Sequence, residues 1–244
     1  MKKIAVLTAL LFATLQIGYA QKVGLVLSGG GAKGAAHIGV IKALEENGIP
    51  IDYITGTSAG AIVGSLYAMG YTPEEMVELM LSEEFSYWQT GTVENEYKYY
   101  FKRPDPTPEF GHFSIDMTDS LQVKASFLPQ SLINPIQMNQ AFMALFSQAT
   151  AKAGWNFDNL FVPFRCVASD IYSKKAIIFK NGDLGDAVRA SMTFPFFFQP
   201  IWKDSVPIFD GGIYDNFPVG PMKEAFHPDF IFGSTVAGGN NKPS

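Results

Sequence analysis

The sequence contains very few of the residues from which several common kinds of functional site are built. Cys166 is the only cysteine among the 244 residues, so the chain cannot form an internal disulfide bond. It lies in the apolar stretch FRCVASD, which favours a buried, inert thiol over a nucleophile. Carboxylate clusters of the calcium-binding type are also missing from the sequence, and we expect no metal and no other cofactor.

Positive charge and long apolar runs are scarce as well. The chain has 18 Lys and Arg against 23 Asp and Glu, which gives a formal net charge of −5. No basic stripe indicates a nucleic-acid partner. After residue 20, the sequence offers no run of about 18 consecutive apolar residues that could span a membrane. The length suits one domain with a substantial core.

The first twenty residues, MKKIAVLTALLFATLQIGYA, form a segment of their own. Two lysines precede an apolar stretch from Ile4 to Leu15, and Gly18-Tyr19-Ala20 follows it. This order is typical of a secretory signal peptide that ends in a small-x-Ala cleavage site. We therefore expect residues 1–20 to be removed and residues 21–244 to be exported from a bacterial cytoplasm. The mature protein would then lie in the cell envelope, in the periplasm or at the outer membrane, or be secreted.

Apolar runs and helical patterns alternate along the next part of the chain. The sequence predicts short strands at 22–28 and 49–55, each followed by a helix, the first of which begins near Ala32. A further helix follows TPEE, residues 72–75, which supply an N-cap, a first-turn proline and a capping-box glutamate. Strands and helices in this order predict an α/β fold with parallel central strands.

Two aromatic segments allow more than one interpretation. Residues 85–130 mix aromatics, charges and prolines without a clear period, and they predict either an irregular cap over the site or a plain surface excursion. FPFFFQPIW, residues 194–202, could be a core strand, an apolar wall for an acyl chain, or both. Between them, residues 135–152 carry Met and Phe at helical spacing, which predicts a helix packed on the core.

The first motif with chemical meaning is GTSAG, residues 56–60, which fits G-x-S-x-G. It follows a predicted strand and begins a predicted helix, as in a nucleophile elbow, where the turn projects the serine hydroxyl. Gly56 and Gly60 would leave room for the close approach of strand and helix. The plainer alternative is a turn in which Ser58 serves only as a helix N-cap.

The second motif is the glycine loop in LSGGGAKGAAHIGV. Gly29, Gly31 and Gly34 also fit the dinucleotide pattern G-x-G-x-x-G, but that site needs an acidic residue at the end of the second strand. Asp52 is the nearest candidate, and it begins that strand instead. Free amides beside a helix start, together with Lys33, suit a transient negative charge, so we interpret the loop as an oxyanion hole.

The third motif is Asp210-Gly211-Gly212, an aspartate at the end of a predicted strand followed by two glycines. A simple turn is the alternative interpretation. All three motifs would lie at the carboxyl ends of strands, where the sites of α/β proteins gather.

GGGAKG, GTSAG and DGG, in this order and spacing, resemble the motifs of the patatin-like phospholipase family. RASMTFP resembles a further block of that family, A-S-x-x-x-P, with Ala190, Ser191 and Pro195 matching. The similarity extends over residues 23–236. It implies a three-layer α/β/α fold around a central, mainly parallel sheet.

The resemblance also implies a function and a set of site residues. The function is that of a serine lipid acyl hydrolase of phospholipase A type, which cleaves glycerophospholipid esters through an acyl-enzyme. Its partners would be a phospholipid substrate and a membrane surface. Ser58 would be the nucleophile and Asp210 its base. The glycine-loop residues implied for the oxyanion hole, and the glycines that support the other two motifs, are Gly29, Gly30, Gly31, Lys33 and Gly34, and Gly56, Gly60, Gly211 and Gly212.

A base of this kind faces a physical difficulty, because a free aspartate has a pKa of about 3.9. Burial of Asp210 would raise that pKa and exclude competing water. Most of the barrier reduction must then come from the oxyanion loop, where one lost donor costs about 3 kcal/mol.

Two rivals of the dyad remain open from the sequence. Of the three histidines, His37 falls in the first helix and His112 in the irregular segment, whereas His227 follows Asp210 in the chain order of an α/β-hydrolase triad. Too few strands separate the glycine loop from Ser58 for that fold, which favours the dyad. The non-enzymatic rival is an exported lipid-binding or membrane-docking module with an idle site.

The sequence ends in GSTVAGGNNKPS, directly after an apolar run. This abrupt end leads us to expect a fragment of a longer protein. Some exported members of the patatin-like family, which the sequence resembles, continue into periplasmic modules and an outer-membrane barrel.

Overall fold

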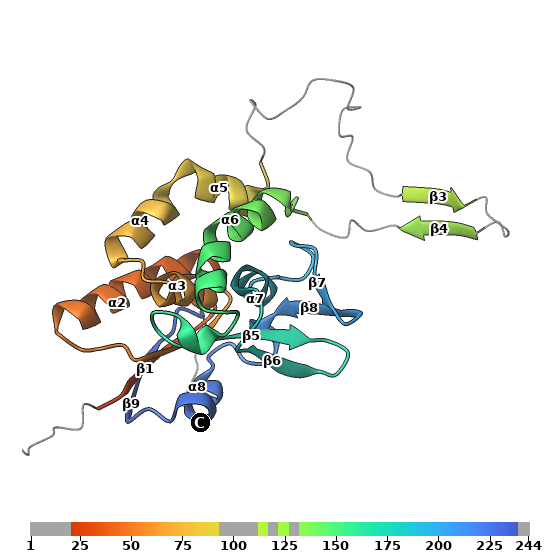
Figure 1. Ribbon diagram of the computed structural model, residues 1–244. Helices are drawn as coiled ribbons and strands as arrows, with labels where there is room; N and C mark the ends of the chain where they lie inside the picture. The colour runs from red at the N-terminus through yellow and green to blue at the C-terminus, as the bar shows by residue number, and fades with distance from the viewer. Residues whose placement is uncertain (1–20, 93–111, 117–121, 127–131, 239–244) are drawn as a thin grey trace, which may run out of the picture.

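The computed structural model describes residues 21–92, 112–116, 122–126 and 132–238 (Figure 1). The predicted signal peptide and most of the segment 93–131 lie outside the described residues. None of the helices in the described ranges is both long and apolar enough to cross a bilayer.

The central element of the fold is a seven-stranded sheet in the order β7-β8-β5-β2-β1-β9, with β6 paired to β5 outside this path. A separate two-stranded antiparallel sheet joins β3 and β4. The strands are β1 Val23–Leu27, β2 Tyr53–Thr57, β3 His112–Asp116, β4 Gln122–Ser126, β5 Phe164–Asp170, β6 Lys175–Phe179, β7 Ile201–Lys203, β8 Val206–Asp210 and β9 Phe230–Ser234.

The middle of the sheet is parallel, as the sequence predicts. Strands β9, β1, β2 and β5 run in the same direction, whereas β6, β7 and β8 form antiparallel pairs at one end of the sheet. All five residues of β1 are buried. A continuous apolar strand of this kind is typical of parallel sheets that are covered on both faces.

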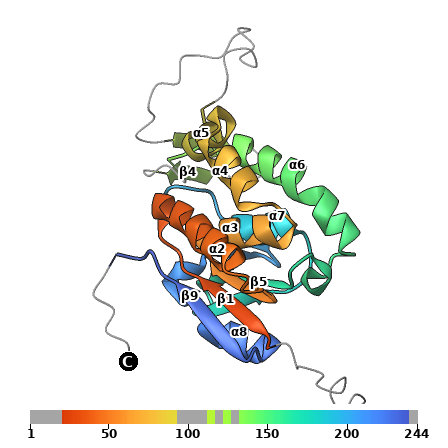
Figure 2. The same cartoon turned by 90° about the vertical axis from the view of Figure 1, so that its left-hand side faces the viewer.

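Helices cover both faces of the sheet, which gives three layers (Figures 1 and 2). Most of the helices lie on one face, whereas α8 lies on the other face beneath β1 and β2. The α-helices are α2 Ala36–Glu46, α3 Ala59–Ala68, α4 Pro73–Leu81, α5 Glu83–Thr90, α6 Ile136–Lys152, α7 Leu184–Ser191 and α8 Val219–Phe226, and the 3-10 helices are η1 Gly31–Ala35, η3 Phe157–Asn159 and η4 Gly211–Ile213.

Several predicted elements are confirmed, including α6 and the capping box of α4, in which Thr72 and Glu75 bond each other's backbone amides. Others begin elsewhere. The glycine loop first forms η1 rather than an α-helix, and the second strand covers 53–57 rather than 49–55, because pairing with β1 starts only at Tyr53.

The start of the segment predicted to be irregular is also corrected, because residues 85–90 belong to helix α5. The Ser82 hydroxyl caps this helix by accepting the Phe85 amide, and Gly91 ends it in the left-handed conformation at φ 68°. The helix therefore begins at a serine N-cap and ends at a left-handed glycine, as many helices do. The mixed aromatic composition of the segment makes these two signals hard to recognise in the sequence.

The pairing along β5 brings two strand ends together. β2 pairs with the first part of β5 and ends with Thr57 opposite Val167, whereas β8 enters antiparallel and ends with Asp210 opposite Ala168. β6 overlaps both in its pairing with β5, so it occupies the opposite edge. β2 and β8 therefore share one edge of β5, and their carboxyl ends meet there.

Candidate active site

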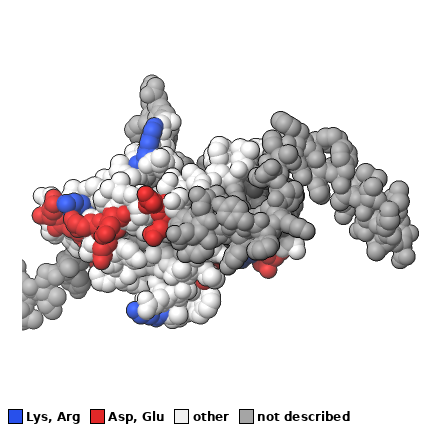
Figure 3. Space-filling view, turned by 90° about the horizontal axis from the view of Figure 1, so that it is seen from above, with Lys and Arg blue, Asp and Glu red and all other residues white. Residues whose placement is uncertain are grey.

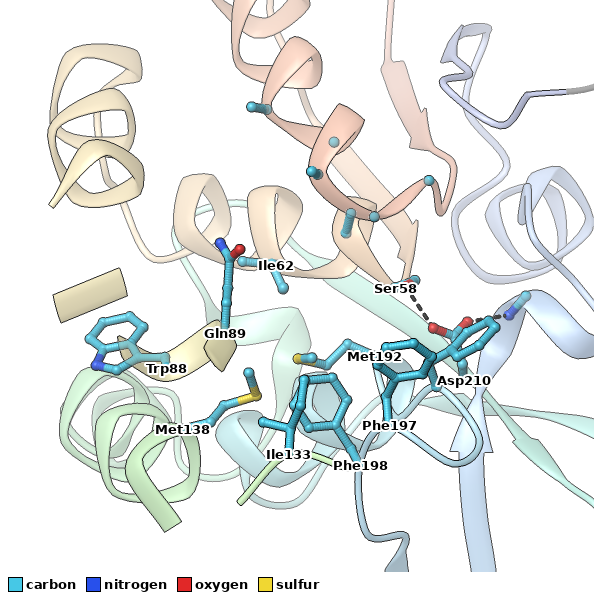
Figure 4. Close-up of a pocket in the computed structure, with 18 of the residues that line it drawn as sticks. Ser58, Ile62, Trp88, Gln89, Ile133, Met138, Met192, Phe197, Phe198 and Asp210 are labelled. Atoms are coloured by element: carbon cyan, nitrogen blue, oxygen red, sulfur yellow. Dashed lines mark hydrogen bonds between the residues drawn. The ribbon is translucent and has the colours of Figure 1, made fainter. Parts of the chain in front are cut away.

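Ser58 forms the sharp turn between β2 and α3. Its backbone has φ 54° and ψ −121°, a left-handed conformation that is unfavourable for a residue with a side chain. It occupies the N-cap position of α3, but its hydroxyl makes no capping hydrogen bond. The hydroxyl donates instead to Asp210 Oδ2 at 2.6 Å (Figure 4). The plainer interpretation of Ser58 as a helix cap is therefore wrong.

The second oxygen of Asp210 also has a donor, since Gly212 N–H lies 2.7 Å from Oδ1. The residue is only 6% exposed. Burial raises the pKa of Asp210 above its usual value, against the opposing effect of the hydrogen bonds from Ser58 and Gly212. A carboxylate with this environment is a better base than a free aspartate.

Close approaches of the backbone explain the glycines of two motifs. A Cβ at Gly60 would collide with the carbonyl of Leu27, and one at Gly211 would collide with the carbonyl of Val167. These contacts let α3 start directly above the sheet and let the chain turn directly after Asp210. The motif glycines thus allow the two strand ends to approach each other.

The glycine loop presents fewer free amides than its sequence suggests. Gly29 lies against the Ser58 side chain, but its N–H donates to the Asn216 carbonyl at 3.1 Å. Gly30 and Gly31 line the cleft beside Ser58, and no acceptor for their N–H groups occurs in the described ranges. These two amides are therefore the candidates for an oxyanion hole.

The remaining candidates from the sequence lie around this loop in different ways. Gly34 lines the cleft and packs against Ala59. Lys33 is exposed and is not among the residues that line the cleft. Asp52 lies at the other end of the strands, where it accepts from the Val23 amide, so the geometry of a dinucleotide site is not formed.

The histidine of the rival triad lies at the wrong end of the sheet. His227 ends α8 and precedes β9, whose first residue pairs with the first residue of β1. Ser58 follows the carboxyl end of β2, so the length of a strand separates the two residues. The structure does not bring His227 to Ser58, so a triad of Ser58, Asp210 and His227 is not formed.

His37 has a structural contact instead. It is fully buried, with Nε2 2.9 Å from the Ser28 carbonyl and Nδ1 2.7 Å from Ser234 Oγ. Burial lowers the pKa of His37, although the bond to Ser28 opposes this effect. The histidine therefore holds the residue that precedes the glycine loop. His112 lies in β3, and its side chain lies outside the described atoms.

A cleft of about 1000 Å³ extends from Ser58 and Asp210. Its walls are mainly apolar, and Figure 4 shows these side chains extending from Met192 to Trp88. The apolar side chains that line the cleft from α5, α6 and the turn after α7 include Trp88, Met138, Phe142, Met192, Phe197 and Phe198. The segment 194–202 thus contributes to the cleft wall with its first part, and only its last residues form a strand, β7.

The structure adds residues to the site that the motifs did not single out for a role. Ser191 accepts the Ser58 amide at 2.9 Å, and the Thr193 carbonyl accepts the Asp210 amide at 2.8 Å. Asn216 contacts the glycine loop through its main chain and, at 3.4 Å, through its side-chain amide. The match of Ser191 to A-S-x-x-x-P was the only sequence signal for these contacts.

In the described part of the chain, no group of three or more His, Cys, Asp or Glu side chains could hold a metal ion. Cys166 is buried, as expected, and burial raises the pKa of its thiol.

Comparison with known proteins places this site in a family. Residues 25–223 match the patatin-like phospholipase family. The chain belongs to this family. Patatin-like phospholipases are lipid ester hydrolases, which is the enzyme class that the sequence predicts, and the α/β fold with its mainly parallel central sheet is confirmed.

The relatives cover most of this patatin-like domain. Lysophospholipase NTE1 of Pyricularia oryzae is 31% identical over 217 residues, which are 88% of this chain and 12% of that protein. A patatin-like phospholipase domain-containing protein of Caenorhabditis elegans is 29% identical over 203 residues, 82% of this chain and 12% of that protein. The chain therefore spans about an eighth of these relatives. Both come from eukaryotes, so they do not support the expected bacterial origin.

Among solved structures, VipD from Legionella pneumophila resembles the domain with a TM-score of 0.53 at 16% identity. The alignment covers 87% of this chain and 49% of that one, and the likeness concerns the fold alone.

The buried state of Asp210 predicts that Asp210→Asn stabilises the protein at neutral pH. Burial raises the pKa of Asp210, so the ionised form of this carboxyl group destabilises the folded protein. We expect a gain of about 0.5–2 kcal/mol in the free energy of unfolding at pH 7, measured by urea denaturation. The gain should disappear as the pH falls through the raised pKa of Asp210 and the wild-type carboxyl becomes protonated.

The matched control is Asp204→Asn, because Asp204 is exposed in the turn between β7 and β8. Equal free energies of unfolding for wild type and Asp210→Asn, both at pH 7 and below the pKa of Asp210, would show that the buried carboxylate does not destabilise the protein.

Proposed function

We propose that this domain is a serine lipid acyl hydrolase of phospholipase A type that acts through Ser58 and Asp210. The observation that carries the proposal is the 2.6 Å hydrogen bond from Ser58 Oγ to the buried Asp210, at the end of an apolar cleft. Nucleophile and base lie within direct hydrogen-bond reach, as nucleophilic catalysis requires.

In the proposed reaction, Ser58 Oγ attacks the ester carbonyl while its proton passes to Asp210 Oδ2. The Gly30 and Gly31 amides donate to the oxyanion that develops. As the tetrahedral intermediate collapses, Asp210 delivers the proton to the departing alcohol and the acyl-enzyme forms. Water then attacks the acyl-enzyme with Asp210 as base, and Ser58 leaves with the returned proton.

The substrate is proposed to be a glycerophospholipid ester whose acyl chain lies along the apolar cleft. The cleft of about 1000 Å³ supports this, because its wall is mainly apolar and includes aromatic and sulfur-containing side chains from α5, α6 and the turn after α7. The name of the relative from Pyricularia oryzae, a lysophospholipase, also supports a lipid with an acyl ester.

A lipid surface is the proposed partner, because exposed apolar side chains lie beside the cleft. Phe196 is 72% exposed in the turn that also carries the cleft residues Phe194 and Phe197. Its carbonyl accepts the amide of Leu132, which is 66% exposed. Exposed rings of this kind mark contacts with membranes or proteins.

Charge favours a zwitterionic rather than an anionic surface. Figure 3 shows acidic side chains gathered over the part of the molecule where Figure 1 places α2 and α4. Glu74, Glu75 and Glu78 are exposed on α4. Repulsion from these carboxylates would oppose docking on an anionic bilayer.

Export is proposed on the basis of residues 1–20. The proposal of periplasmic and outer-membrane modules beyond residue 244 rests on the resemblance to exported members of the family. The order of charged, apolar and small residues in residues 1–20 supports a signal peptide.

The dyad predicts that Ser58→Ala and Asp210→Asn each reduce turnover at least about 1,000-fold. His227→Ala serves as the control and should stay within about twofold of the wild type, because His227 lies at the other end of the strands. The measurement is fatty-acid release from phosphatidylcholine and lysophosphatidylcholine. Full activity in both dyad variants would refute the mechanism, and an inactive wild type that binds lipid would favour the binding module.

The exposed turn predicts that Phe196→Ser weakens binding to phosphatidylcholine vesicles about tenfold, since a buried phenyl ring contributes about 1.5–3 kcal/mol. Binding is measured by vesicle sedimentation in a Ser58→Ala background, which prevents hydrolysis. Phe161→Ser is the matched control, because Phe161 is 76% exposed beside Gly70, beyond the far end of α3. Equal losses in both variants would show that the turn is not a docking surface.

The signal-peptide proposal predicts a mature protein that starts at Gln21. Expression of the full sequence in a Gram-negative host, followed by N-terminal sequencing of the envelope fraction, tests this. Retention of Met1 in a cytoplasmic product would contradict export.

A further inference from the structure

The block RASMTFP has no part in the chemistry proposed above, yet it contacts both members of the dyad. Ser191, the last residue of α7, accepts the Ser58 N–H at 2.9 Å and donates its own hydroxyl to the Val167 carbonyl at 2.6 Å. Two residues further on, the Thr193 carbonyl accepts the Asp210 N–H at 2.8 Å. One short segment therefore holds the backbone of the nucleophile and the backbone of the base.

We propose that Ser191 is a positioning residue that sets Ser58 at bonding distance from Asp210. The inference rests on the proposed function, because it assigns a role to the distance between these two side chains. Ser191 does not contact the cleft, and it acts only through the Ser58 main chain.

A hydroxyl suits this position because it can accept one hydrogen bond and donate another at the same time. Ser191 is completely buried, so bulk solvent does not reach its hydroxyl. Without the hydroxyl, the Ser58 amide and the Val167 carbonyl would each lose a partner. The penalty for such unpaired groups drives the backbone to rearrange.

The backbone of Ser58 is the part of the site most in need of support. Its φ of 54° is unfavourable for a residue with a side chain, and such a conformation persists only where surrounding contacts hold it. The Ser191 hydroxyl binds the amide of this residue directly. A relaxation at Ser58 would move Oγ away from Asp210 without altering the cleft walls.

Thr193, which bonds the Asp210 amide, is itself held in place by hydrogen bonds. The Arg189 guanidinium donates to Thr193 Oγ1 at 2.6 Å, and Thr193 Oγ1 donates back to the Arg189 carbonyl at 2.7 Å. Arg189 also donates to the Asn139 side chain and to the Gln199 carbonyl. These bonds fix the Thr193 carbonyl that accepts the Asp210 amide.

The test compares Ser191→Ala with Ser65→Ala. Ser65 is the matched control, since it is also completely buried and its hydroxyl donates to a carbonyl within α3, that of Ile62. We expect Ser191→Ala to reduce kcat about 10- to 100-fold, as a displacement of about 1 Å at a reacting group does. KM should stay within about twofold because the cleft is unchanged, and Ser65→Ala should keep the wild-type kcat.

A second pair of variants keeps the test decisive if Ser191→Ala does not fold. Ser191→Thr and Ser191→Val have the same shape and differ in the hydroxyl alone. The threonine variant should turn over at least about tenfold faster than the valine variant, with similar KM values. Equal kcat in this pair, or equal kcat in Ser191→Ala and Ser65→Ala, would overturn the role of Ser191.

The same assay distinguishes failure of the proposed function from failure of the role assigned to Ser191. An inactive wild type, or a wild-type rate in Ser58→Ala, overturns the proposed function and the inference with it. An active wild type that depends on Ser58 and Asp210 but not on the Ser191 hydroxyl overturns the inference alone.

Discussion

The site depends on one feature of the sheet, the shared edge of β5. Strand β2 ends opposite Val167 and strand β8 ends opposite Ala168, so two strands that run in opposite directions stop at consecutive residues. The turn at Ser58 and the carboxyl group of Asp210 meet at this point. Main-chain pairing along β5 therefore fixes how closely the two side chains approach each other.

Two residues of the site, Ser58 and Asp210, reduce the stability of the protein, and contacts with the rest of the fold hold them in place. Ser58 is held in an unfavourable backbone conformation, and Asp210 is buried with a raised pKa. Contacts around them are correspondingly complete. Gly212 and Ser58 donate to the two oxygens of Asp210, and Ser191 satisfies the Ser58 amide. Strain and burial at one point, with saturated hydrogen bonds around it, are typical of a preorganised active site.

The sequence allowed the α/β fold and the local form of each motif to be predicted, because these depend on neighbouring residues. Pairing between distant strands could not be predicted, and it is the antiparallel entry of β8 that brings Asp210 to β5. The same limit applies to the glycine loop. Its amides look equivalent in sequence, but the Asn216 carbonyl, 187 positions away from Gly29, occupies one of them. Helix α5 was missed because its segment shows no clear helical period in the sequence; two of its aromatic residues, Phe85 and Trp88, line the cleft.

Direct contact between Ser58 and Asp210 also explains how the glycine loop must be built. A separation of 2.6 Å leaves no space for an imidazole ring between Ser58 Oγ and Asp210 Oδ2, so in the proposed reaction the proton passes directly to a carboxylate. Because a carboxylate is a weak base even when buried, stabilisation of the oxyanion must supply more of the rate. That requires amides that do not move during the reaction. The bonds of His37 to Ser28 and of Asn216 to Gly29 hold the start of the loop in place. In the proposed mechanism, this rigidity compensates for the weakness of a carboxylate base.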